Sequence, residues 1–195
     1  MRVVVVVAHP NPKGFSHAIA SAAHDTLVTC GHEVALLDLY AEGFRTAMTL
    51  DERRAYHSTR PILDPIVERH AGIVKEAAAL VFIYPTWWST MPAILKGWLE
   101  RVMVPGVGFV FDEDHHVRRG LVGVHRIVGI STYGAPWFYV KAIHDNGRRT
   151  LLRALRLNTA LLTRASWLAL YKMDTRTAEQ RATFLRRVER KMRSL

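Results

Sequence analysis

The chain opens with five consecutive valines, Val3–Val7, followed at once by a segment rich in proline, histidine and small residues, 8–18. Such a β-branched run is typical of a strand buried on both faces, and these strands occur in parallel sheets covered by helices. In open sheets of this kind, ligands bind beyond the carboxyl ends of the strands, where the first helix offers free amides to an anion. The opening residues therefore predict an α/β protein with an anion site after its first strand.

Length and composition favour one domain over residues 1–195, because a chain that is 49% hydrophobic can bury one core of this size. No apolar run approaches the roughly 18 residues of a membrane helix, so no membrane insertion is expected. The valine run is short and lacks a clean cleavage site, which argues against a signal peptide. The lone Cys30 falls late in a predicted helix, which indicates a reducing compartment and a packing role. We expect a cytoplasmic protein.

The formal net charge of +10 is compatible with nucleic acid, an acidic membrane surface or an anionic cofactor as partner. Many of the cations recur at helical spacing beside apolar residues, a pattern typical of solvated helix faces. No recognised nucleic-acid module accompanies them, so no nucleic-acid partner is expected. These cations are Arg148, Arg149, Arg153 and Arg156, then Arg181, Arg186, Arg187, Arg190, Lys191 and Arg193.

The acidic and histidine residues of 112–116 offer metal-type ligands but crowd a predicted surface loop. No zinc-type spacing appears elsewhere in the chain. We interpret the segment as a solvated loop and predict no metal site.

Hydrophobic periodicity and capping signals predict five strands separated by helices. Asp51 is expected to cap a short helix, Gly31 to end the first helix, and Thr177 with Gln180 to form a capping box. Residues 104–125 are glycine-rich and expected to be irregular. The strands are 2–8, 33–39, 80–84, 126–131 and 166–171, and the helices 16–29, 52–57, 61–76, from 92, 140–157 and from 177.

This alternation predicts a three-layer α/β sandwich. Gly106 and Gly108 follow a helix and lack a third glycine, so they form no dinucleotide fingerprint. Chain length and a site after the first strand favour a flavodoxin-like, five-stranded parallel sheet of order 2-1-3-4-5 over a dinucleotide Rossmann fold. The loops after strands one, three and four should therefore converge at one edge.

The first of these loops supplies Ser16 and His17 near a helix amino terminus, with His9 and Lys13 close by. A hydroxyl, imidazoles and free amides can together bind a phosphate or pyrophosphate. A simple helix cap would need Ser16 alone, so the additional basic groups favour an anion site.

The second loop sets Trp87 and Trp88 between Pro85 and Pro92. A flat redox ring needs an apolar wall and backbone donors near its polar edge, and this segment can provide both. The alternative interpretation, a core or dimer-interface anchor, is compatible with the first.

The third loop, 131–139, has small residues where backbone can approach a ring closely, and it leads to Tyr139 and His144. A phenol and an imidazole can give or take protons as a ring gains or loses hydride. Spacing alone leaves open that both are ordinary helix residues.

These segments resemble the flavodoxin-like NAD(P)H:quinone oxidoreductases, the family that includes DT-diaphorase. The matching pieces are His9-Pro10 with 15–17, then 84–88 continuing through 91–102, and the resemblance spans most of the chain. It implies that the first segment binds flavin phosphates, the second lies along the isoalloxazine, and the third completes the ring site. Carried over by position, the cofactor residues are His9, Ser16, His17, Pro85, Thr86, Trp87, Trp88, Ser131, Thr132, Tyr133 and Gly134.

The resemblance also implies a charge and proton relay by Tyr139 and His144, and two-electron, ping-pong hydride transfer from NAD(P)H through flavin to quinones or similar acceptors. Family members are commonly homodimers. The cofactor is FMN or FAD, with the short chain favouring FMN, and the choice between NADH and NADPH stays open. Many relatives have two glycines where this chain has Tyr133-Gly134, so we expect the Tyr133 side chain to cover part of the flavin or substrate pocket.

Two other functions fit parts of the pattern. Some compact relatives are flavin-binding regulatory subunits of potassium efflux systems, and a basic surface would suit an acidic partner. A flavodoxin-type one-electron carrier fits poorly, because such carriers are usually acidic and their flavin loops differ.

Overall fold

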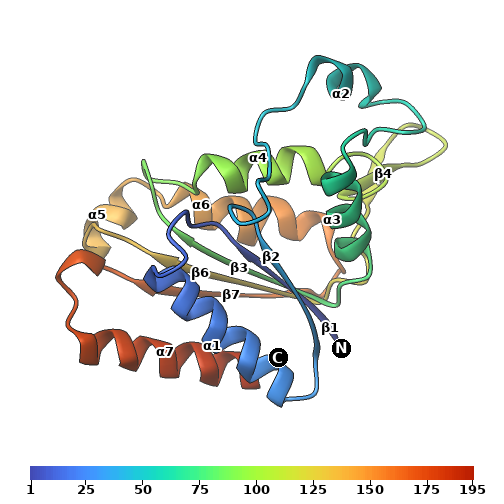
Figure 1. Ribbon diagram of the computed structural model, residues 1–195. Helices are drawn as coiled ribbons and strands as arrows, with labels where there is room; N and C mark the ends of the chain where they lie inside the picture. The colour runs from blue at the N-terminus through green and yellow to red at the C-terminus, as the bar shows by residue number, and fades with distance from the viewer.

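The computed structural model describes residues 1–195 and contains a five-stranded parallel sheet in the order β2-β1-β3-β6-β7 (Figure 1). In chain order these are the five predicted strands, so the predicted order 2-1-3-4-5 is confirmed. The last strand begins two residues earlier than expected. The strands are β1 (Arg2–Val7), β2 (Glu33–Asp38), β3 (Ala79–Pro85), β6 (Arg126–Thr132) and β7 (Arg164–Leu170).

Helices cover both faces of the sheet, as the valine run of β1 requires. Val3, Val5 and Val7 pack in a core with α1 (Phe15–Thr29) and α7 (Ala178–Arg193). Val4 and Val6 point into a second core, which includes residues of α3 (Pro65–Lys75) and α4 (Ala93–Val102). All five valines are buried, which confirms a strand covered on both faces.

The segment between β2 and α3 carries the short helix α2 (Leu50–Ala55). Its cap is Thr49 and not the predicted Asp51, because Thr49 forms a capping box with Glu52. The Glu52 carboxylate also accepts a hydrogen bond from Arg101 Nε of α4 at 3.0 Å. Helix α3 begins later than predicted, since the Asp64 side chain accepts from the Ile66 amide and caps the helix there.

The stretch expected to be irregular contains a small hairpin, β4 (Phe109–Phe111) paired with β5 (Val117–Arg119). One Asp112 oxygen accepts from the amides of Asp114 and His116, and the other accepts from Arg118 Nε at 2.7 Å. The Asp112 side chain therefore closes this exposed loop.

The predicted helix 140–157 is wrong in detail, because the segment is divided. It consists of α5 (Trp137–Ala142), a break, α6 (Asn146–Arg149), a π turn η1 (Thr150–Ala154) and a 3-10 turn η2 (Leu155–Asn158). At the break, His144 and Asp145 adopt left-handed backbone with φ of 66° and 43°. The Asp145 carboxylate is buried against Tyr133, and this contact holds the chain in the broken conformation.

Three further predictions concern the ends of the helices and Cys30. The capping box of Thr177 and Gln180 on α7 is confirmed, and Gly31 is left-handed after α1 with φ of 79°. Cys30 is exposed at the end of α1, so its predicted packing role is wrong. None of the helices is both long and apolar enough to cross a bilayer.

The pairing of β6 with β7 depends on a glycine. A Cβ at Gly129 would lie 2.0 Å from the Trp167 ring of the neighbouring strand. We expect Gly129→Ala to lower the free energy of unfolding by about 1–3 kcal/mol through overpacking, measured by urea denaturation. The matched control is Gly123→Ala, whose Cβ would meet its nearest atom at 3.6 Å. Equal denaturation midpoints for the two variants would contradict this account.

Candidate functional site

The turn after β1 leaves backbone donors free at the edge of the sheet. Gly14 occupies the cap position of α1 and no side chain caps this helix, so Ser16 does not act as its cap. The amides of Phe15 and Ser16 in the first turn have no acceptor within the chain. Free amides at a helix amino terminus attract anions. The geometry of this turn therefore suits a phosphate.

Two histidines flank this turn. His17 Nε2 lies 2.9 Å from an Asp38 oxygen, whereas its Nδ1 is buried without a partner. His9 Nδ1 lies 3.1 Å from the Asn11 amide nitrogen and 3.2 Å from the Asn11 carbonyl oxygen, so the ring is held against this turn by its Nδ1 edge. A Cβ at Gly14 would lie 2.8 Å from the His9 ring, and only glycine fits there without moving it.

The loop after β3 approaches these histidines through Trp87, whose ring centroid lies 6.1 Å from that of His9. The Trp87 amide donates to the Thr90 carbonyl at 3.0 Å, and the Thr90 amide donates back at 3.1 Å. Trp88 and Ser89 form the tip with φ of 46° and 62°. Two non-glycine residues in left-handed backbone cost about 1–3 kcal/mol each, and such strain concentrates at functional sites.

Direct hydrogen bonds join the second and third loops. The Thr86 amide donates to the Thr132 carbonyl at 2.8 Å, and the hydroxyls of Thr86 and Ser131 share a hydrogen bond of 2.8 Å. Ser131, Thr132 and Pro85 are buried, whereas Gly134 is exposed. The two loops thus form one connected surface at the carboxyl edge of the sheet.

The expectation that Tyr133 covers a ligand pocket is wrong. Its side chain is buried, with the hydroxyl donating to Asp145 Oδ2 at 3.0 Å and accepting from Trp167 Nε1 at 3.1 Å. The ring stacks on Tyr171 with centroids 4.9 Å apart. These partners draw the side chain inward, so Tyr133 supports the loop from beneath.

This buried cluster disfavours charge. Burial, and then the Asp145 carboxylate, hold the pKa of Tyr133 well above its ordinary value. Burial also raises the pKa of Asp145, against the opposing effect of the Tyr133 hydrogen bond. The hydroxyl of Tyr84 is buried nearby without a partner, and burial raises its pKa well above normal. The cluster therefore keeps its two phenols protonated.

The predicted proton pair lies at the rim of the site. Tyr139 is exposed on α5, and His144 is exposed in the break that follows. No hydrogen bond joins the two side chains. Trp88 is 99% exposed, and Trp137 and Phe138 of α5 are also exposed. The structure thus brings His9, His17 and Trp87 together and leaves Trp88, Tyr139 and His144 exposed to solvent.

One cation was misassigned from the sequence. The sequence predicts Arg181 on a solvated helix face, yet its guanidinium lies 6.0 Å from the ring centroid of Phe15, at the start of α1. Its Nε is buried without a partner. Arg181 thus packs on the residue that offers the free amide of the phosphate-type turn. Its sequence spacing resembles that of the other α7 arginines, and nothing else in the sequence distinguishes it.

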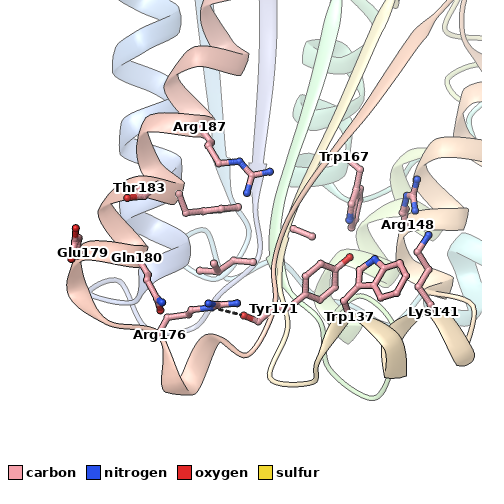
Figure 2. A pocket seen from close by; sticks show the side chains of 13 residues that line it. Trp137, Lys141, Arg148, Trp167, Tyr171, Arg176, Glu179, Gln180, Thr183 and Arg187 are labelled. Atoms are coloured by element: carbon pink, nitrogen blue, oxygen red, sulfur yellow. Dashed lines mark hydrogen bonds between the residues drawn. The ribbon is translucent and has the colours of Figure 1, made fainter.

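A groove of about 720 Å³ lies along the open edge of β7 (Figure 2). Trp137, Lys141 and Arg148 flank it on one side and α7 on the other, and Arg176 Nε donates to the Tyr171 carbonyl at 2.8 Å. No predicted cofactor residue lines this groove. Because Trp137 belongs to the third loop, the groove adjoins the site formed by the loops after β1, β3 and β6, which we call the three-loop site.

A family model, Flavodoxin_2, described as a flavodoxin-like fold, matches residues 1–194, so the chain belongs to this family. The human ribosyldihydronicotinamide dehydrogenase (quinone) is 29% identical over 174 residues, covering 81% of this chain and 74% of that protein.

Two solved structures share the fold over nearly their full length. Smu.1420 from Streptococcus mutans UA159 is 28% identical with a TM-score of 0.85, and the match covers 100% of both chains. The NAD(P)H:quinone oxidoreductase from Methanothermobacter marburgensis is 26% identical with a TM-score of 0.82, covering 99% of this chain and 98% of the other.

The Tyr133 cluster allows a direct test. We expect Tyr133→Phe to destabilise the protein by about 1–3 kcal/mol, since it removes the partner of both Asp145 and Trp167. Tyr171→Phe, which keeps the stacked ring and removes a hydroxyl that makes no hydrogen bond with the chain, serves as control. Urea denaturation at pH 7 measures both, and a Tyr171→Phe loss as large as that of Tyr133→Phe would refute the assignment.

Proposed function

We propose that the protein is a flavin-dependent NAD(P)H:quinone oxidoreductase, which transfers two electrons from NAD(P)H to a quinone-type acceptor in a ping-pong cycle. The supporting observation is the convergence of the free-amide turn, the Trp87 hairpin and the Thr86–Ser131 link at one edge of the sheet. The dehydrogenase named above is a relative in sequence, and the oxidoreductase named above shares the fold.

The residues present fit a flavin. The free amides of Phe15 and Ser16 provide donors that a phosphate would satisfy, and Nδ1 of His17 is a buried polar atom beside them that has no partner within the chain. When bound, the flavin would supply a ring that accepts hydride from NAD(P)H and passes it to the acceptor. We assign the phosphate to His9, Ser16 and His17, and the ring to Pro85, Thr86, Trp87, Trp88, Ser131, Thr132, Tyr133 and Gly134. Tyr133 contributes through its backbone only.

FMN is our proposed cofactor, in preference to FAD, because the chain is short. Arg181 beside Phe15 adds a cation close to the phosphate-type turn, which suits either flavin. Release of the bound flavin by heat and chromatography of the supernatant against FMN and FAD distinguishes the two.

The chain's own groups have three tasks in this reaction. The linked loops orient the reactants, and the exposed rings of Trp87, Trp137 and Phe138 exclude water when a flat substrate covers them. Tyr139 Oη and the His144 imidazole give or take the proton that accompanies hydride transfer. The exposed aromatic rim also suits association with a second copy, and we propose a homodimer.

The first test is the visible spectrum of the purified protein. We expect flavin absorbance that bleaches when NADPH is added anaerobically and returns when a benzoquinone follows. A colourless protein that takes up neither FMN nor FAD would refute the proposal.

The roles of the rim residues are tested by stopped-flow bleaching. We expect His144→Ala and Tyr139→Phe to slow bleaching by NADPH roughly 10²-fold, as for loss of an acid–base group, with the flavin still bound. Tyr171→Phe, in the buried cluster, should bleach at the wild-type rate. Unchanged rates in both rim variants would remove their assigned roles.

A further inference from the structure

A second groove, of about 520 Å³, begins at His144 and follows the helical segment formed by α6, η1 and η2. Its volume lies within the range of small-molecule sites. Six of its nine lining residues are basic: Lys141, His144, Arg148, Arg149, Arg153 and Arg156. The sequence predicts these basic side chains on a solvated helix face, whereas the structure gathers them around one groove.

The charge of this groove is not balanced by the protein. Lys141 and the four arginines make no salt bridge, since the ion pairs of the chain involve other cations. The only carboxylate in the lining is that of Asp145, which is buried and bonded to Tyr133. Several like charges held around one hollow repel one another, and a bound anion relieves that repulsion.

The groove starts at the rim of the three-loop site. Gly147, in the first turn of α6, packs on the second loop, where its Cβ position lies 2.8 Å from Tyr84 Oη and 3.1 Å from the Met91 amide. Residues 146–158 follow from there, a helical length of roughly 20 Å at about 1.5 Å per residue. The cations therefore extend from the proposed hydride-transfer site along one line, as the phosphates of an extended dinucleotide would.

We propose that this groove binds the phosphates of the dihydronicotinamide dinucleotide, with the 2′-phosphate held by Arg149 and Arg153, so that NADPH is preferred over NADH. The inference rests on the proposed function, which supplies the dinucleotide. Guanidinium groups match phosphate oxygens in pairs, and this makes arginine suited to such recognition. The groove offers no Trp, Tyr or Phe for stacking bases, which disfavours single-stranded nucleic acid as occupant.

Direct binding tests the assignment without requiring turnover. In isothermal titration of the purified protein, adenosine 2′,5′-bisphosphate should bind at least tenfold more tightly than adenosine 5′-diphosphate. Arg149→Ala/Arg153→Ala, which changes two exposed side chains, should abolish that difference. Arg193→Ala, an exposed α7 residue paired with Glu189, is the charge-matched control for one arginine and should retain it.

Kinetics supply the second arm. The double variant should raise the KM for NADPH at least tenfold and leave oxidation of the phosphate-free donor N-ribosyl-dihydronicotinamide unchanged. Equal binding of the two adenosine phosphates, or affinity unchanged in the double variant, would overturn the groove assignment. A (dT) oligonucleotide that binds more tightly than the bisphosphate would reassign the groove to nucleic acid. Failure of the proposed function is distinguishable, because the wild type would then oxidise neither donor.

Discussion

Burial of β1 on both faces is the constraint on which the rest of this structure depends. The valines of one strand contribute alternately to two cores, so helices must cover each side, and the neighbouring strands run parallel as is typical of sheets buried in this way. Parallel strands place their carboxyl ends at one edge, and the three loops that leave β1, β3 and β6 meet there. The candidate site is thus a geometric consequence of the burial of Val3–Val7.

Strand positions could be predicted from the sequence because each strand is a local apolar run, and the observed strands agree within two residues. The break after α5 could not, since it depends on a hydrogen bond between Tyr133 and Asp145, twelve residues apart. The inward orientation of the Tyr133 side chain could not be predicted either, because one of its partners, Trp167, lies on a later strand. The spacing of apolar residues along the chain does not indicate such long-range contacts.

The candidate site, too, could be predicted from the sequence only in part. Residue types and a family resemblance indicated which loops to consider, and the structure shows which of their groups meet: Thr86 with Ser131, and His9 with Trp87. Arg181 illustrates the limit, because it is one of many evenly spaced arginines in the sequence and only packing on Phe15 separates it from them. The arginines of the α6 segment illustrate the converse, since a face interpreted as solvated encloses a groove.

The hairpin at Trp88 and Ser89 has a consequence for the timing of ligand exchange. Two reciprocal hydrogen bonds hold a tip whose two central residues both adopt disfavoured backbone, whereas the strand beneath it is fully buried. Local opening of such a segment costs far less than unfolding the domain. We expect the hairpin to open independently of the sheet. The residence time of a ligand bound against the second loop then depends on how fast the four-residue turn Trp87–Thr90 relaxes.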